Sequence, residues 1–219
     1  MNVRSRPVLA YRWVVFLLAG GYAVYQIWTA NYANFGGPFR FLTIWALLAS
    51  FFAASRMLAI TERRSDREWE PVIATTATMN AMVVILYWRL YFIDPALVSN
   101  GLPVWHQQYY LHLLGPLLQW TDMLLIWRGF RRYLPAAAIL TAVTIAYIAW
   151  TEFALAPLSA RPVGSVTSGL PYPFLNDMML NERLAYYATN VAAAWLVLAL
   201  FWGIARIFRG ALGPSFARE

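Results

Sequence analysis

The stretch Gly36-Gly37-Pro38-Phe39-Arg40-Phe41-Leu42-Thr43 leads directly into the largely apolar run 44–54. Glycine and proline interrupt regular structure and so end the preceding segment. Arg40 has the position of a residue that faces lipid headgroups, and Thr43 is the first hydroxyl inside the next predicted helix. A threonine at such a position usually hydrogen-bonds to its own helix backbone. Its importance therefore depends on which other polar groups reach the same depth.

The composition indicates a protein that folds in a bilayer. Of the 219 residues, 61% are hydrophobic and only 12% are charged, which is more apolar surface than a soluble domain of this size can bury. The 11 Trp, 13 Tyr and 13 Phe are enough to form the aromatic belts that mark both membrane interfaces. The predicted fold class is all-α, a polytopic integral membrane protein.

Six hydrophobic segments are long enough to cross a hydrocarbon core of about 30 Å at about 1.5 Å per residue. They are 8–28, 41–60, 72–93, 109–127, 133–155 and 184–208. The first segment has no small-residue cleavage site and is too long for a signal sequence. We therefore predict one six-helix transmembrane domain over 1–219, with outer loops at 29–40, 94–108 and 156–183.

The distribution of arginine predicts the orientation. All 17 basic residues are arginine, and most lie near the chain ends and in the loops after the second and fourth segments. The opposite side has only Arg40, Arg89, Arg161 and Arg183. The positive-inside rule therefore places both termini in the cytoplasm, and a bacterial inner membrane fits best. Topology also explains the net charge of +7 better than a nucleic-acid partner does.

Several kinds of chemistry are excluded. The chain has no cysteine for disulfides or thiolate sites and no lysine for a Schiff base. Its only histidines are His106, beside Trp105 in a loop, and His112. A bis-histidine haem or a multi-histidine metal site is therefore not expected, and we predict neither metal nor cofactor. Sequence motifs of soluble hydrolases and nucleotide-binding proteins are absent.

Polar residues inside membrane spans are costly and usually functional. Counting from the outer ends of the predicted helices places Thr43, Arg89, His112 and Glu152 in one outer layer, with Arg40 nearby. On the fourth segment, Gln119 and then Asp122 continue the polar stripe inward from His112, and Gly115 and Pro116 predict a kink or a close approach.

Each of these residues also has a structural interpretation. His112 could cap a helix or hydrogen-bond a neighbour, and Arg89 could form an ion pair with Asp94 or Glu152. Asn80 and Asn190 could join helices, as could the stripe of Thr141, Thr144 and Thr151. In the functional interpretation, the arginine holds a lipid carboxylate or stabilises an oxyanion.

Three blocks together resemble the androgen-induced gene family, which includes the androgen-dependent regulator of tissue factor pathway inhibitor and bacterial membrane proteins. The blocks are Gly36-Gly37-x-Phe39-Arg40-Phe41-Leu42-Thr43, then Pro95-x-Leu97 through Pro103-x-Trp105 to Leu111-His112-x-x-x-Pro116, and finally Tyr172-Pro173-Phe174-Leu175. The spacing from His112 to Pro116 is similar to that of the bacterial branch.

The resemblance implies a six-helix membrane hydrolase that cleaves fatty acid esters of hydroxy fatty acids, with Thr43 as nucleophile and His112 as base. The residues alone are compatible with this pair, because a threonine hydroxyl needs a base close by and His112 is the only imidazole in a predicted span. Depth alone does not distinguish Thr43 from Thr151. The predicted substrate-binding residues are Arg40, Arg89, Gln119, Glu152 and Tyr172.

Two other functions stay open. A non-catalytic protein that binds or transports fatty acids would use the same polar layer to recognise a carboxylate, and Arg89 or Arg40 would then matter more than Thr43. A scaffold for other membrane proteins would use the long outer loop as its contact surface. The expected partners are a lipid ester or fatty acid and the membrane lipids. The sequence does not indicate an oligomeric state.

Overall fold

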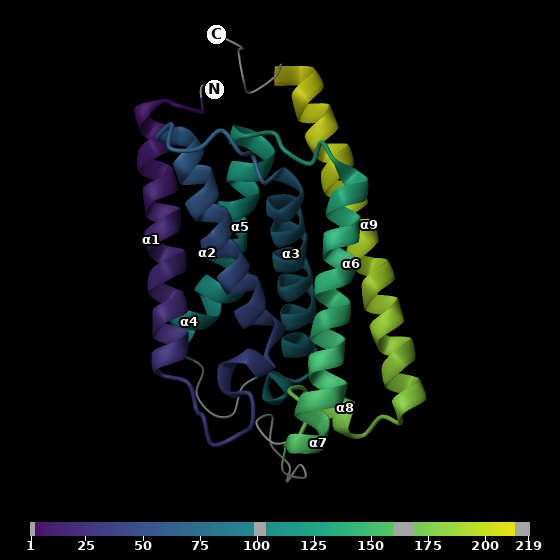
Figure 1. Cartoon of the computed structure of the whole chain (residues 1–219). Helices are drawn as coiled ribbons and strands as arrows, with labels where there is room; N and C mark the ends of the chain where they lie inside the picture. Colours follow the sequence, from purple (N-terminus) through teal and green to yellow (C-terminus); the bar gives the residue numbers. More distant parts are fainter. Residues whose placement is uncertain (1–2, 99–103, 160–168, 213–219) are drawn as a thin grey trace.

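A computed structural model describes residues 3–98, 104–159 and 169–212, and this part of the chain is helical with no β-strand. Pro103, Arg161 and Arg218, which the sequence motifs and the charge distribution used, lie outside these ranges. The long helices stand side by side in a bundle (Figure 1). They are α1 (Arg6–Trp28), α2 (Leu42–Thr61), α3 (Glu70–Ile93), α6 (Tyr133–Ala149) and α9 (Leu180–Leu212).

Five described helices are long and apolar enough to cross a membrane, because α6 continues through the π-helical η5 (Trp150–Leu155) and α7 (Ala156–Leu158). The fourth predicted span is also helical, but it alternates between geometries and is not among these five. It consists of α4 (Trp105–Tyr109), the π-helical η3 (Tyr110–Leu114), α5 (Gly115–Trp120) and the π-helical η4 (Thr121–Ile126). Single π turns of this kind often mark functional sites.

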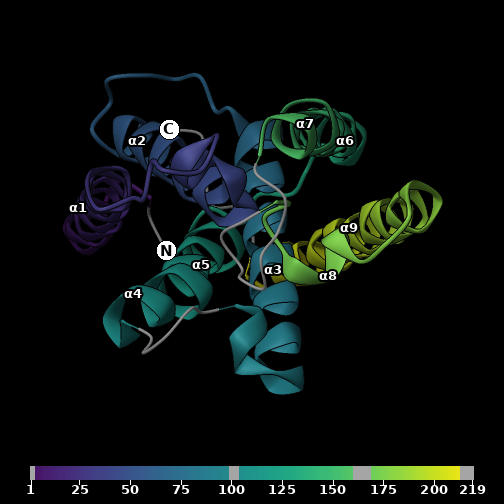
Figure 2. The same cartoon turned by 90° about the horizontal axis from the view of Figure 1, so that it is seen from below.

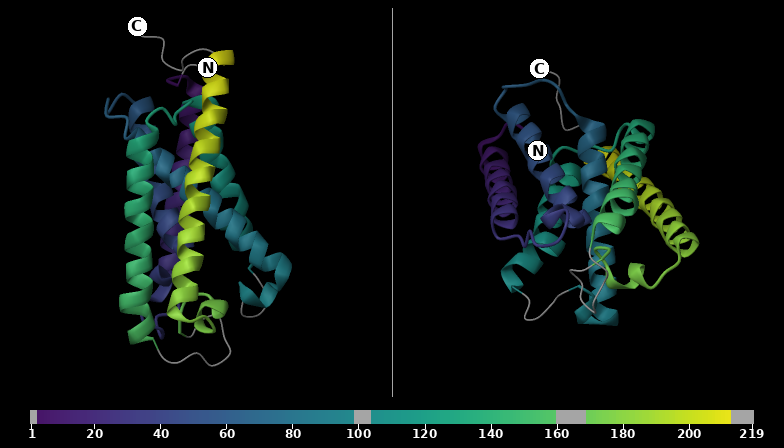
Figure 3. Two further views of the ribbon diagram at one scale, coloured as in Figure 1. Left: turned by 90° about the vertical axis from the view of Figure 1, so that its right-hand side faces the viewer. Right: turned by 60° about the horizontal axis from the view of Figure 1, so that its bottom comes forward.

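Short elements connect these helices at the end of the bundle opposite the N-terminus of α1. The 3₁₀ turn η1 (Gly37–Arg40) leads into α2, η2 (Pro95–Leu97) follows α3, and α8 (Pro173–Asn176) precedes α9. At this end of the bundle, α3 and α4 lean away from α6 and α9 (Figure 3). This end of the bundle is therefore the less regular one.

Helix α3 lies at the centre of the bundle, where it contacts α2, α5, α6 and α9 (Figure 2). Ala74 and Ala77 of α3 are fully buried, and such small residues allow neighbouring helices to approach closely. Met57, Met123 and Leu140 pack into the same core from α2, η4 and α6. The core thus supports α3 from several sides along its length.

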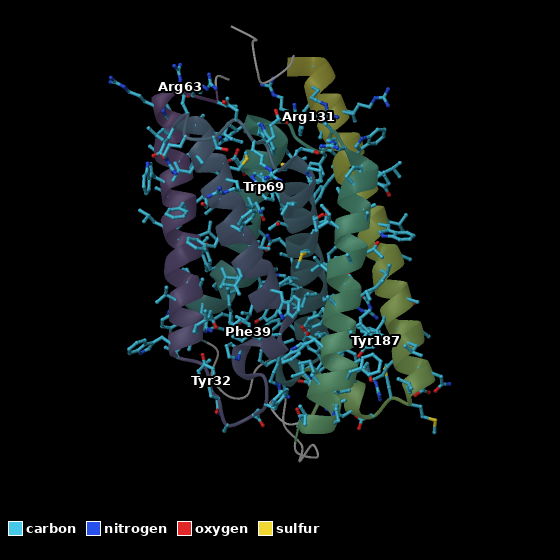
Figure 4. All side chains as sticks on the ribbon, in the orientation of Figure 1. Tyr32, Phe39, Arg63, Trp69, Arg131 and Tyr187 are labelled. Carbon is cyan, nitrogen blue, oxygen red and sulfur yellow. The ribbon has the colours of Figure 1, made fainter. Side chains whose placement is uncertain are left out.

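The arginine-rich end is the end at which α1 begins and α9 finishes (Figure 1). Figure 4 labels Arg63 and Arg131 there, and Tyr32, Phe39 and Tyr187 at the other end. Below, "inner" means the arginine-rich end and "outer" the opposite end.

An ion pair joins three elements near the inner end. The guanidinium of Arg12 donates from Nε and Nη2 to the two carboxylate oxygens of Asp122, at 2.8 and 2.7 Å. Its Nη1 donates to the Met57 carbonyl at 2.9 Å and to Thr61 Oγ1 at 2.6 Å. Arg12 is only 1% exposed. This arginine, one of those near the start of the chain, is therefore buried among α1, α2 and η4.

Candidate functional site

The glycine-rich turn before α2 fixes the position of Thr43. Gly36 and Gly37 have positive φ angles of 83° and 47°. A side chain at Gly36 would come within 2.7 Å of Leu155, and one at Gly37 within 2.8 Å of the Tyr32 ring. Only glycine meets both demands without strain. The tight turn holds η1 against the other outer elements, and Thr43 then follows as the second residue of α2.

The hydroxyl of Thr43 does not bond to its own helix in the usual way. Its nearest upstream acceptors are the carbonyls of Phe39 and Arg40. The first accepts the indole N–H groups of Trp45 and Trp150 at 3.0 and 3.1 Å, and the second accepts the Tyr147 hydroxyl at 2.7 Å. Other helical threonines do donate to the carbonyl four residues earlier, namely Thr76, Thr78, Thr121, Thr141, Thr144, Thr151 and Thr189.

The described partner of the Thr43 hydroxyl is His112, with 3.4 Å between Oγ1 and Nε2. His112 Nδ1 lies 3.2 Å from the carbonyl of Gln108. A carbonyl can only accept, so Nδ1 carries the proton and Nε2 is the unprotonated acceptor that faces Thr43. A hydroxyl, a neutral imidazole and a third group that orients the imidazole form the arrangement of an activated nucleophile. The distance is long for a hydrogen bond, as it commonly is before a substrate binds.

Neighbouring residues hold the imidazole in this orientation. Pro116 has no N–H and cannot donate an α-helical hydrogen bond to the His112 carbonyl. That carbonyl accepts the indole N–H of Trp88, on α3, at 2.8 Å. The ring of Tyr87 stacks on the imidazole, with the ring centroids 3.5 Å apart and the planes 7° apart. The spacing His112-x-x-x-Pro116 thus leaves a carbonyl available for a bond between α3 and the fourth segment.

Thr43 and His112 line a cavity of about 210 Å³ at the outer end of the bundle. Its walls come from α1, from the start of α2, from the outer part of α3, from α4 and η3, and from Pro171 and Tyr172. Most of the surface is apolar, and Phe41, Leu86 and Leu90 contribute to it. A largely apolar cavity with few polar groups is typical of a site for a small or lipid ligand.

Two glutamines in the wall have hydrogen-bonding capacity to spare. Gln26, on α1, is 9% exposed, and its Nε2 has no hydrogen-bond partner in the described part of the chain. Oε1 of Gln108, on α4, also has no hydrogen-bond partner in the described part of the chain. Buried polar groups are rarely left unpaired in folded proteins. An unpaired donor and an unpaired acceptor in one cavity wall indicate that a ligand completes their hydrogen bonds.

Comparison with known families gives a match to the FAR-17a/AIG1-like protein family over residues 8–206. The chain belongs to this family. Comparisons with curated proteins and with solved structures give no match. The family match covers all the described helices that line the cavity. The androgen-induced gene family that the sequence motifs resemble is therefore confirmed, whereas membership of its bacterial branch stays a prediction.

In this AIG1-like chain, three predicted substrate-binding residues lie in or next to the cavity. Tyr172 lines it, and burial raises the pKa of the Tyr172 phenol to about 12, so that the hydroxyl keeps its proton at neutral pH. Gln119 lies in a narrower chamber on the inner side of Thr43. Arg40 lines an adjoining outer cavity of about 360 Å³, and its guanidinium donates to the Gly169 carbonyl.

The remaining two predicted residues do not line the cavity. Glu152 accepts from Arg183 at 2.9 and 2.8 Å and from the Tyr187 hydroxyl at 2.7 Å, so it joins η5 to α9. Arg89 is exposed. Asp94 accepts from the backbone of Ala96 at the start of η2. The ion pair considered for Arg89 with Asp94 or Glu152 is therefore replaced by the pair of Glu152 with Arg183.

Four residues of the AIG1-like site were not predicted from the sequence, namely Gln26, Tyr87, Trp88 and Gln108. Tyr87 and Trp88 look like members of an aromatic belt, and Gln26 looks like a residue near the end of a helix. A glutamine is costly in a membrane span wherever it lies. That cost is a sequence signal that could have identified Gln26.

Proposed function

We propose that the chain is an intramembrane threonine hydrolase that cleaves lipid esters. One observation carries the proposal: the Thr43 hydroxyl faces the unprotonated nitrogen of a buried histidine at 3.4 Å, inside an apolar cavity. His112 itself is only 6% exposed. A threonine hydroxyl becomes a useful nucleophile at neutral pH only beside such a base.

In the proposed mechanism, His112 Nε2 takes the proton of Thr43 while Oγ1 attacks the ester carbonyl. The resulting tetrahedral intermediate expels the alcohol oxygen, which takes the proton from His112. The product is an acyl ester of Thr43. Water then attacks this ester, with His112 again accepting and returning a proton, and the fatty acid leaves. The Gln108 carbonyl keeps the same imidazole nitrogen available in both halves.

Attack on the carbonyl creates a negative charge on oxygen that needs a hydrogen-bond donor. The unpaired Nε2 of Gln26 in the cavity wall suits this role. A donor fixed in a water-poor site stabilises such a charge strongly. No arginine lines this cavity among the described residues, which favours a neutral donor over the cation expected from the sequence.

The two outer cavities support a substrate with both an ester and a free carboxylate. The larger one, lined by Arg40, shares Gln26, Phe41, Ile44 and Gln107 with the cavity that contains Thr43. An ester bound at Thr43 would thus direct its carboxylate toward an arginine, which pairs well with carboxylates. Fatty acid esters of hydroxy fatty acids have this chemistry, and we propose them as the substrate class.

We further propose that 105–126 spans the membrane as a sixth helix, with both termini in the cytoplasm of a bacterium. The site then opens toward the non-cytoplasmic side of the inner membrane. The start of α1, the end of α9 and the arginine-rich loops lie at the same end of the bundle, which supports this orientation.

The test is hydrolysis of a branched fatty acid ester by purified protein, with wild type beside Thr43→Ala and Thr151→Ala. Thr151 is a matched control because its hydroxyl donates to the Tyr147 carbonyl at 2.9 Å. We expect Thr43→Ala to lose hydrolysis and Thr151→Ala to retain it. Equal activity of all three proteins would refute Thr43 as the nucleophile.

A non-catalytic fatty-acid-binding protein is the second candidate. The long distance between Thr43 and His112 and the arginine beside the site favour it. It predicts tight binding of fatty acids without turnover, and a larger loss of binding in Arg40→Leu than in Thr43→Ala. Calorimetry with a fatty acid and the two variants distinguishes it from the hydrolase.

A further inference from the structure

A second chamber of about 30 Å³ lies on the inner side of Thr43. It shares only Thr43 and Leu111 with the cavity proposed for the ester. A water molecule needs about 10–15 Å³ and two to four polar partners, so the chamber is large enough for water and too small for an acyl chain. Besides Thr43, its polar wall residues are Ser50, Asn80, Gln119 and Asp122, and Tyr110 adds a phenol ring.

A chain of hydrogen bonds fixes the direction of each donor in this wall. The Ser50 hydroxyl donates its one proton to the Ala46 carbonyl at 2.7 Å. Its oxygen therefore accepts from Asn80, whose Nδ2 lies 2.8 Å away. The same Asn80 amide nitrogen donates to Oε1 of Gln119. The backbone carbonyl thus determines which atom of each side-chain amide is the nitrogen.

Gln119 Nε2 is the donor that remains at the end of this chain. Gln119 is 7% exposed, and its Nε2 has no partner in the described part of the protein. A buried unpaired N–H destabilises a fold, so a ligand that accepts from it is favoured. An amide N–H repels cations, and the small volume excludes lipids. Water is the acceptor that fits.

We propose that this chamber binds the water molecule that hydrolyses the acyl-threonine. The inference rests on the proposed hydrolase function and adds a separate water site to it. While the substrate fills the outer cavity, the chamber keeps water next to Thr43, which lines both spaces. A hydrolase embedded in lipid needs such a store because the surrounding hydrocarbon supplies no water.

In the second half-reaction, the water oxygen bonds to the acyl carbon, and one water proton moves to His112 Nε2. The bond between that carbon and Thr43 Oγ1 then breaks, and Oγ1 takes the proton from His112. The products are a free fatty acid and the original Thr43 hydroxyl. Gln119 holds the water before this step and touches no substrate atom.

The experiment is stopped-flow hydrolysis of p-nitrophenyl octanoate by the purified full chain, for wild type and Gln119→Leu. If acylation is intact and deacylation is slow, the initial burst of p-nitrophenolate keeps its rate while the steady-state rate falls by about tenfold. Intact-mass measurement then shows the acyl adduct on the variant during turnover. Asn190→Leu is the control, because Asn190 donates to its own helix at the Tyr186 carbonyl at 2.8 Å.

Ser50→Ala gives a second variant in case Gln119→Leu does not fold, because it removes the acceptor that orients Asn80. An unchanged steady-state rate in the folded variants, with Thr43→Ala inactive, would overturn the water site and leave the hydrolase intact. Equal loss of burst and steady-state rates would also overturn it, since Gln119 would then act in acylation. Hydrolysis that persists in Thr43→Ala would overturn the proposed threonine hydrolase itself.

Discussion

The two ends of the bundle use buried polar groups in opposite ways. At the inner end, Arg12 and Asp122 form a two-point ion pair, and Nη1 of Arg12 donates to the Met57 carbonyl and to Thr61 at 2.9 and 2.6 Å. At the outer end, Thr43 and His112 are 3.4 Å apart beside a cavity of about 210 Å³. Gln26, in the wall of that cavity, keeps an unpaired donor within the described part of the chain.

This difference separates structural polarity from functional polarity. Buried charges that pair with each other and bond to neighbouring groups act mainly to fix how helices pack. Buried groups with spare donors beside a cavity are costly to the fold and are expected where a ligand compensates them. Burial alone does not distinguish the structural polar groups of the inner end from the functional ones of the outer end.

The largest effect is expected for His112→Ala, which removes the base at the outer end. Hydrolysis of lipid esters should fall by roughly 10³–10⁴-fold, because general base catalysis and activation of the nucleophile are both lost. The free energy of unfolding should change less than for variants at the inner end. Initial rates with purified protein measure the first effect, and denaturation in mixed micelles measures the second. A variant with wild-type rates would show that the outer pair is structural.

The next effect is on stability, for Asp122→Leu at the inner end. It leaves the Arg12 cation buried without its partner, which costs roughly 3–5 kcal/mol. The double variant Arg12→Leu with Asp122→Leu should recover much of this loss, because the unpaired charge is removed as well. Unfolding by sodium dodecyl sulfate measures the stability of the single and the double variant. If Asp122→Leu is as stable as wild type, the ion pair does not stabilise the bundle.

A smaller effect on catalysis is expected for Gln26→Leu. Loss of one donor to an oxyanion lowers kcat by about 10²-fold in comparable sites, with less effect on KM. Gln107→Leu is a matched control, since Gln107 is a less buried glutamine in the wall of the same cavity. Equal rates for the two variants would exclude a special role for Gln26.

The smallest effect is expected for Trp88→Phe, which removes the indole donor to the His112 carbonyl. A lost hydrogen bond of this kind costs about 1 kcal/mol, and a looser imidazole should lower the rate several-fold. Trp195→Phe is the control, because it loses a comparable bond from its indole nitrogen to Thr141 Oγ1 at 3.0 Å, and neither residue lines the cavity. The control should match Trp88→Phe in stability and keep wild-type hydrolysis. Equal hydrolysis by the two variants would show that Trp88 does not position the imidazole.

Much of the fold follows from the sequence. The predicted second span, 41–60, agrees closely with α2 at Leu42–Thr61, because an unbroken apolar run has to be helical in a bilayer and a glycine-proline turn precedes it. Near Gly115, where a kink or a close approach was predicted, the segment has a π turn: the Gly115 N–H donates to the Tyr110 carbonyl, and a side chain at 115 would lie 3.0 Å from that carbonyl. The proximity of Thr43 and His112 follows from their equal depth on two neighbouring helices.

The direction in which a side chain points from its helix is less predictable from the sequence than its depth in the membrane. Glu152 has the expected depth, but it lies in the π-helical η5, and a π turn changes the direction in which the following side chains point. Arg12 is one of the arginines near the start of the chain whose distribution predicted the orientation, yet its guanidinium is buried beside Asp122, 110 residues later. Neither a π turn nor a distant partner leaves a local signal in the sequence.

The most direct test of the threonine mechanism is to locate the acyl group during turnover. Wild-type protein is mixed with a p-nitrophenyl ester, quenched with acid and digested at arginine, which places Thr43 in the peptide 41–56 together with Ser50 and Ser55. Fragmentation should assign the acyl mass to Thr43, and the adduct should be absent from Thr43→Ala. An acyl group on another residue, or hydrolysis that persists in Thr43→Ala, would contradict the mechanism.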